Sequence, residues 1–187
     1  DVLWEALNSY TPPFYKGKAL PASQSSVRVM AVPHIVSGET EVDPATLVYQ
    51  WKRDGKYREF YNQSGFGKQS VVFQKSIVSS ADLVTVEVSP VSGKTSAVGE
   101  MVVRQYTPDP IIYRNHPLYG IQYWEGFQNT FVMDDQEADL VVEPFYFSSL
   151  SRDALSYLWR VGAIPLSDKE GAGSSVIFRN ENGGGER

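Results

Sequence analysis

Apolar and polar residues alternate along several short stretches of the chain. In residues 47–52, Leu, Tyr and Trp occupy every second position, and residues 27–32 and 84–89 have the same period. A period of two turns one side of a strand toward a core and the other toward solvent. The pattern therefore predicts an all-β fold, in which only residues 79–82 and 152–155 are expected to form short helical turns.

Turn-forming residues separate these stretches. Asp54-Gly55 follows one of them directly, and Ser92-Gly93 follows another. Asp-Gly between two extended runs is typical of a β-hairpin, because glycine adopts the positive φ that the turn requires.

Four blocks of sequence recur in the same order. They are residues 47–52 and 155–160, 65–67 and 171–173, 71–73 and 176–178, and 10–15 and 106–113. The most specific block, Leu-x-Tyr-x-Trp, recurs at an offset of 108 (155 − 47). An ordered set of matches predicts two copies of one structural unit, residues 1–107 and residues 108–187, with the Tyr-Thr-Pro segment of the last block opening each unit. We expect Trp51 and Trp159 to lie buried at equivalent positions, each in a strand of its own unit.

The spacing of prolines predicts an insertion early in the second unit. Pro110 precedes Pro144 by 34 residues, whereas Pro13 precedes Pro33 by only 20, a difference of 14. The extra residues fall within 117–139 and bring a candidate binding surface of five aromatic residues: Tyr119, Tyr123, Trp124, Phe127 and Phe131. Such side chains offer rigid contact area to a glycan or protein partner. The alternative is that they only cover the sandwich of the second unit or the joint between the two units.

The second unit also lacks its last two strands. The strands predicted at residues 83–88 and 101–106 have no counterpart after Phe178. We therefore expect an open sheet edge beside residues 155–160, which is an aggregation hazard unless something pairs with it. Either the natural chain continues beyond Arg187, or another chain donates a strand, as in an appendage subunit.

The segment from residue 47 to 56, Leu-x-Tyr-x-Trp-Lys-x-Asp-Gly-Lys, resembles the core strand and hairpin of immunoglobulin-like and PKD-like domains. Such domains occur as tandem repeats in secreted bacterial surface proteins. The resemblance implies tandem Ig-like β-sandwiches, the second one truncated. It also implies a structural, adhesive or spacer segment of an extracellular or cell-surface protein. The chain has no cysteine, so the inter-sheet disulfide of antibody domains cannot form.

Charge and hydropathy exclude several classes of partner. The net charge of −5 is spread without long runs, which gives no electrostatic footprint for nucleic acid. No apolar run approaches the ~20 residues that a membrane span needs. The sequence opens at Asp1 without a methionine or a basic segment, which is typical of a mature or excised fragment.

Candidate chemistry is sparse. His34 and His116 are the only histidines, and no second ligand lies at metal-binding spacing from either. The acidic residues 134–139 offer oxygen ligands for calcium, but they fit no EF-hand spacing, so a solvated turn is favoured. No Gly-x-Ser-x-Gly motif is present. We expect no catalytic residue, no cofactor and no metal site; the rival is an enzyme with an unrecognised carboxylate site.

Overall fold

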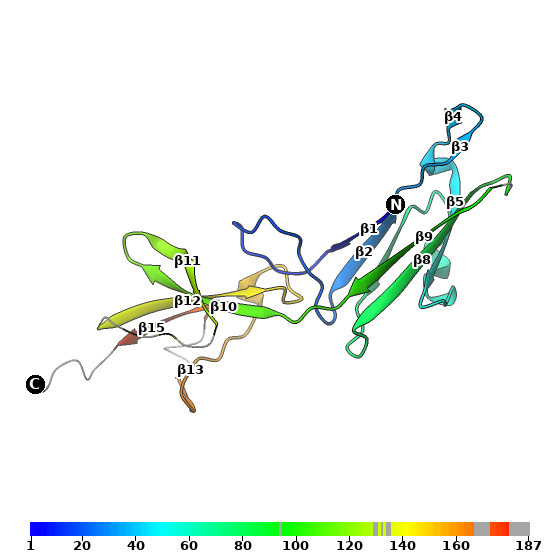
Figure 1. The fold of residues 1–187 in the computed structure, drawn as a ribbon. Coiled ribbons are helices and arrows are strands. Elements are labelled where there is room, and N and C mark those ends of the chain that lie inside the picture. The colour runs from blue at the N-terminus through cyan, green and yellow to red at the C-terminus, as the bar shows by residue number, and fades with distance from the viewer. Residues whose placement is uncertain (94, 129–130, 132, 134–135, 167–172, 180–187) are drawn as a thin grey trace, which may run out of the picture. The chain divides into compact units, whose positions relative to one another are not determined.

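The computed structural model describes residues 1–93, 95–128, 131, 133, 136–166 and 173–179. They form an all-β fold of antiparallel sheets, as the alternation predicted. The chain divides into two compact units (Figure 1). Unit 1 contains Asp1–Ser9 and Gly17–Thr107, and unit 2 contains Tyr10–Lys16 and Pro108–Arg187. The short segment Tyr10–Lys16 thus belongs with residues that follow it by about a hundred positions in the sequence.

Unit 1 is built from two main sheets. The first has the order β1-β2-β7, with strands β1 (Val2–Ala6), β2 (Ser26–Ala31) and β7 (Ser70–Gln74). The second has the order β6-β5-β8-β9, with strands β5 (Leu47–Arg53), β6 (Gly65–Phe66), β8 (Ala81–Pro90) and β9 (Ala97–Arg104). A small hairpin joins β3 (Val36–Ser37) to β4 (Thr40–Glu41), and two 3-10 helices, η1 (Pro44–Thr46) and η2 (Arg58–Gln63), flank β5.

One apolar core lies between the two main sheets of unit 1. Alternate residues of β2 and β7 supply one side, and Leu47, Tyr49 and Trp51 of β5 with the valines of β8 supply the other. Trp51 is fully buried, and its indole Nε1–H donates to the carbonyl of Lys68 at 2.8 Å. The predicted burial of Trp51 in a strand is therefore confirmed.

A buried ionic cluster closes one end of this core. The Asp82 carboxylate accepts hydrogen bonds from Arg53 Nη2 at 2.7 Å and from Lys75 Nζ. Lys75 Nζ also donates to the carbonyl of Val103 at 2.9 Å. The side chains of Lys75 and Asp82 are 0% and 1% exposed, so each charge depends on its partners.

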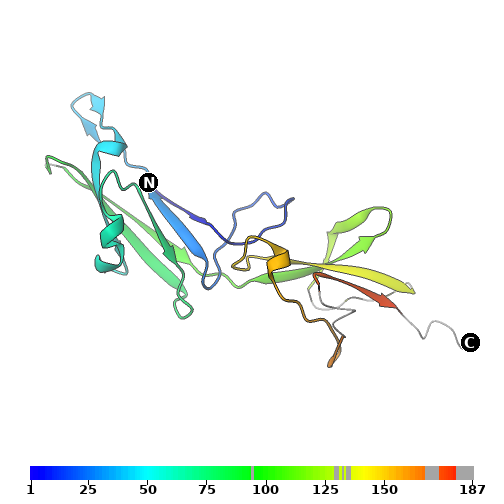
Figure 2. The same ribbon diagram turned by 180° about the vertical axis from the view of Figure 1, so that it is seen from behind.

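Unit 2 contains one main sheet of order β11-β10-β12-β15 (Figures 1 and 2). Its strands are β10 (Asp109–His116), β11 (Gly120–Phe127), β12 (Glu137–Phe145) and β15 (Ser175–Arg179). A two-stranded hairpin, β13 (Arg160–Val161) with β14 (Ile164–Pro165), and the 3-10 helix η3 (Arg152–Ala154) complete its described elements. Of the two predicted helical turns, η3 matches the second, whereas β8 begins at Ala81 within the first.

The strand predicted at residues 155–160 is largely absent. Residues 155–159 lie outside any strand, and only Arg160 enters one, the short β13. Trp159 is half-buried rather than buried. The prediction for this block was therefore wrong, because an extended segment becomes a strand only when a neighbour pairs with it, and no described strand does so here.

Strand register also corrects the predicted insertion. Val2 pairs with Ala31, 29 residues later (31 − 2), and Ile112 pairs with Val142, 30 residues later (142 − 112). The connection across residues 117–133 is thus only one residue longer than the one between β1 and β2. The prediction of an insertion failed because Pro110 is a strand residue paired with Pro144, whereas Pro13 and Pro33 lie outside strands.

The match of residues 10–15 with residues 106–113 was wrong for a related reason. Residues 10–15 follow β1, the first strand of unit 1, whereas Tyr106 and Thr107 precede β10, the first strand of unit 2. The Tyr-Thr-Pro segment therefore does not open each unit.

Candidate functional site

The central strand of unit 2, β12, is buried over most of its length, so both faces of its sheet are covered in part. Alternate residues of a strand point to opposite faces. Glu143 and Phe145 point to one face, which we call the clasp face. Ala138 and Leu140 point to the other, which we call the groove face; these two residues belong to the apolar cluster of that side.

Segment Tyr10–Lys16, the clasp, covers the clasp face. Its backbone is tied by two hydrogen bonds, Tyr10 N–H to the Phe147 carbonyl at 2.9 Å and Tyr146 N–H to the Tyr10 carbonyl at 2.8 Å. The Phe14 ring lies 3.9 Å from the Tyr123 ring, centroid to centroid, and 6.4 Å from that of Phe145. Aromatic pairs at such separations stabilise a contact beyond the area they bury.

A buried carboxylate lies beneath the clasp. Glu143 is 1% exposed; its carboxylate accepts a hydrogen bond from the Tyr10 hydroxyl at 2.7 Å and one from Arg152 Nη1 at 2.9 Å. Burial, followed by the hydrogen bond to Glu143, raises the pKa of Tyr10 well above its ordinary value. Among the described residues, every buried side-chain nitrogen and oxygen has a hydrogen-bond partner. The buried polar atoms of this cluster are therefore all paired within the protein, as expected of a structural contact that holds the clasp on the sheet.

We expect unit 2 to lose stability as the pH rises above about 10, the ordinary pKa of tyrosine. Burial and the hydrogen bond to Tyr15 raise the pKa of Tyr146 to about 12, and the pKa of Tyr10 is raised as well. The unfolded chain therefore ionises first, and the stabilisation present below pH 10 is lost progressively toward pH 12. Thermal unfolding followed by circular dichroism between pH 8 and pH 12 measures this loss.

A double variant, Tyr10→Phe with Tyr146→Phe, is the control for that experiment. It should be less stable than the parent at pH 8 and should show a shallower decline above pH 10. An equally steep decline in the double variant would contradict the assignment to these two tyrosines.

The opposite face of the sheet carries an open apolar groove of about 540 Å³. Its apolar lining consists of Ile112, Phe131, Met133, Leu140, Trp159, Val161 and Phe178. Trp159 is anchored by its indole Nε1–H, which donates to the carbonyl of Gly173 at 2.9 Å, and its ring lies 6.5 Å from that of Phe178.

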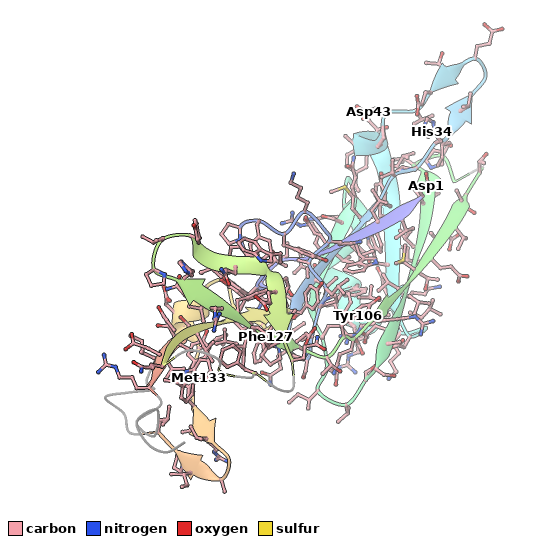
Figure 3. All side chains as sticks on the ribbon, turned by 60° about the vertical axis from the view of Figure 1, so that its left-hand side comes forward. Asp1, His34, Asp43, Tyr106, Phe127 and Met133 are labelled. Carbon is pink, nitrogen blue, oxygen red and sulfur yellow. The ribbon has the colours of Figure 1, made fainter. Side chains whose placement is uncertain are left out.

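The five aromatic residues predicted as one binding surface lie in different surroundings. Tyr119 and Trp124 are 74% and 76% exposed. Tyr123 packs against Phe14 of the clasp. Phe127 is half-buried against Phe131, at 5.0 Å between ring centroids, and Phe131 lines the groove. Figure 3 labels Phe127 and Met133, which lie on either side of Phe131 in the sequence. Of the five, Tyr119 and Trp124 are therefore the two that remain largely exposed.

No metal site is found among the described residues: nowhere do three side chains of His, Asp or Glu gather. His34 Nδ1 lies 2.8 Å from Glu41, and the ring of His116 lies beside Tyr119. Of the acidic residues proposed as calcium ligands, Asp134 and Asp135 lie outside the described residues, Glu137 pairs with Arg179, and Asp139 accepts a hydrogen bond from Asn115. The described part of the chain also contains no helix long and apolar enough to cross a membrane.

Sequence reasoning missed the clasp and its carboxylate. One signal was present: Glu143 is the single charged residue within the apolar run from residue 140 to 147, Leu-Val-Val-Glu-Pro-Phe-Tyr-Phe. A lone carboxylate in such a run indicates a buried acid with a specific partner. The partner Tyr10 lies 133 residues away in the sequence, and no local pattern connects the two.

No protein-family model matches this sequence, and no curated protein and no solved structure is significantly similar to it. The function is therefore argued from the arrangement of its own residues.

Proposed function

We propose that this chain is a tandem of two Ig-like β-sandwich units, the second of them incomplete, that serves as a structural or adhesive spacer of an extracellular or cell-surface protein. The single observation that carries the proposal is the agreement in strand register between the two units, which are alike in pairing although their sequences have diverged.

Three pairings in unit 1 have counterparts in unit 2 at constant offsets. Val27↔Phe73 corresponds to Ala138↔Phe178, Val29↔Val71 to Leu140↔Val176, and Ala31↔Val2 to Val142↔Ile112. The offset is 111 between β2 and β12 (138 − 27), 105 between β7 and β15 (178 − 73), and 110 between β1 and β10 (112 − 2). The offset of 105 is also the one at which Val71-Val72-Phe73 recurs in the sequence as Val176-Ile177-Phe178. A shift of one residue would turn every side chain to the other face, so this agreement of sequence and register supports a common unit.

Hydrogen bonds outside the strands repeat in the same way. Helices η1 and η3 are offset by 108 (152 − 44), and each is capped by the residue before it. The hydroxyl of Tyr49 donates to the Pro44 carbonyl, and that of Tyr157 to the Arg152 carbonyl, both at 2.8 Å. The indole of Trp51 donates to the Lys68 carbonyl, two residues before β7, and the indole of Trp159 donates to the Gly173 carbonyl, two residues before β15. These bonds support the repeat even where residues 155–159 form no strand.

The spacer interpretation follows from what such units do. Repeated sandwiches hold other parts of a protein apart, and the clusters of charged side chains among the described residues are satisfied by one another. Non-enzymatic function and an extracellular location remain part of this proposal.

Mechanical unfolding tests the spacer. Once the clasp has detached from unit 2, a chain pulled by its two ends should unfold unit 1 in one discrete step. The length gain should be roughly 300 Å, as expected for about 100 residues at ~3.4 Å each less the length of the folded unit. The step should arise because β8 and β9 are paired along eight consecutive residues and share one core with β2. Smooth extension without such a step would contradict a load-bearing role.

A carbohydrate-binding function is the second candidate, and the exposed rings of Tyr119 and Trp124 favour it. Binding on a glycan array that is lost in Trp124→Ala, yet retained in Tyr61→Ala, would distinguish it from the spacer. Tyr61 is a suitable control because it is 65% exposed and lies in unit 1.

A further inference from the structure

The groove of unit 2 corresponds to a face that is fully covered in unit 1. Leu140 and Phe178, which line the groove, are the register counterparts of Val29 and Phe73. In unit 1 the sheet that contains β5 and β8 packs on these positions, leaving Val29 0% and Phe73 8% exposed. In unit 2, Phe178 and Trp159 are only half-buried, and the groove above them is open.

The backbone beside the groove also lacks the neighbour that unit 1 supplies. Strand β5 pairs with β8 along seven consecutive residues, from Leu47↔Pro90 to Arg53↔Val84. The corresponding residues 155–159 have no strand partner among the described residues, although Leu155 has the extended dihedrals φ −99° and ψ 150°. The Trp159 carbonyl accepts a hydrogen bond from the Leu166 N–H at 3.0 Å, and the segment before it has no described strand partner. A segment without a strand partner next to an apolar groove is the arrangement on which a peptide strand adds to a sheet.

The sequence of β8 indicates which kind of strand would fit the groove of unit 2. It places Val84, Val86 and Val88 toward the core at alternate positions, and it carries carboxylates at Asp82 and Glu87. Residues 167–172 read Ser-Asp-Lys-Glu-Gly-Ala, and residues 180–187 read Asn-Glu-Asn-Gly-Gly-Gly-Glu-Arg, and neither sequence has β-branched apolar residues at alternate positions.

The charged residues that line the groove favour a strand of the same kind. Arg160 and Arg179 are its charged lining residues, and no carboxylate lines it. Arg179 pairs with Glu137, whereas Arg160 is exposed. In unit 1 the covering strand places Asp82 against Arg53 and Lys75. A strand with a carboxylate near one end therefore complements the groove in charge as well as in shape.

We propose that the groove of unit 2 binds an extended strand of a polypeptide other than a second copy of this chain. The strand has β-branched apolar residues at alternate positions and a flanking carboxylate, and it pairs with residues 155–159. The proposal rests on the register agreement described under Proposed function. It makes unit 2 an acceptor that is completed from outside these 187 residues.

A synthetic peptide with the sequence of residues 81–90, Ala-Asp-Leu-Val-Thr-Val-Glu-Val-Ser-Pro, serves as the probe. We expect it to bind the 187-residue chain saturably in isothermal titration calorimetry. A peptide with serine in place of its three inward-facing valines should bind at least about tenfold more weakly, because it cannot fill the groove. Absence of binding, or equal binding of the two peptides, would overturn the proposal.

A matched pair of variants locates the binding. Phe178→Asp places a charge in the groove and should weaken binding at least about tenfold. Ile177→Asp changes the adjacent residue of the same strand, which is 53% exposed and does not line the groove, and it should leave binding unchanged. Equal weakening by both variants would place the peptide elsewhere and overturn the proposal.

Hydrogen exchange keeps the test decisive if Phe178→Asp fails to fold. In the unmodified chain, the peptide should slow exchange at the amides of residues 155–159; protection confined to other residues would contradict strand addition there. Concentration-dependent dimerisation that blocks the peptide would identify a second copy as the occupant and would also overturn the proposal. Loss of peptide binding with an intact unfolding step of unit 1 counts against this inference alone, not against the spacer.

Discussion

Asp82→Asn is expected to lower the free energy of unfolding of unit 1 by about 3 to 5 kcal/mol, the range found when one partner of a buried ion pair is removed. The asparagine would leave the ammonium group of Lys75, whose side chain is 0% exposed, without its counter-ion, and it would keep only one acceptor oxygen for Lys75 and Arg53 together. It would also weaken the contact with Arg53, which is 15% exposed. Urea denaturation followed by circular dichroism measures the loss.

Two further variants make that result specific. Glu100→Gln removes a carboxylate from an exposed position of β9 and should change stability by no more than about 0.5 kcal/mol. A double variant, Lys75→Met with Asp82→Leu, removes both buried charges and should recover much of the stability. A loss below about 1 kcal/mol in Asp82→Asn would mean that the cluster contributes little to the fold.

Trp51→Ala is expected to destabilise unit 1 by about 3 to 5 kcal/mol, because it leaves a cavity between the two sheets and removes the hydrogen bond to Lys68. Trp159→Ala should destabilise unit 2 by less, since Trp159 is half-buried beside an open groove. Calorimetric unfolding of both variants measures the two losses.

Trp124→Ala is the matched control for this comparison, because the residue is 76% exposed and its loss should change stability by no more than about 0.5 kcal/mol. A loss for Trp159→Ala as large as that for Trp51→Ala would show that the groove is covered in solution. Such a result would argue against an open acceptor face in unit 2.

The sequence by itself determined the strands whose alternation is strict. Residues 27–32, 47–52 and 84–89 were predicted as strands, and they lie in or at the ends of β2, β5 and β8. The burial of Trp51 followed from its phase in such a strand. These features are local, because a period of two depends only on neighbouring residues and on which side of the strand meets a core.

The recurrence of Leu-x-Tyr-x-Trp could also be found in the sequence, but whether each copy forms a strand could not be predicted from it. The same motif forms β5 at residues 47–53 and no strand at residues 155–159. The difference lies in the neighbour: β8 pairs with the first copy, and no described strand pairs with the second. A strand is a property of two segments, so one segment's sequence cannot decide it.

Only the tertiary structure decided how the clasp is placed. Residues 10–16 read as the opening of a unit, yet they lie on the sheet of unit 2, where Tyr10 meets Glu143. Likewise, the five aromatic residues within 117–133 read as one surface and lie in separate surroundings. Contacts between residues more than a hundred positions apart depend on how whole sheets pack. A pattern of neighbouring residues does not determine that packing, so it cannot predict these contacts.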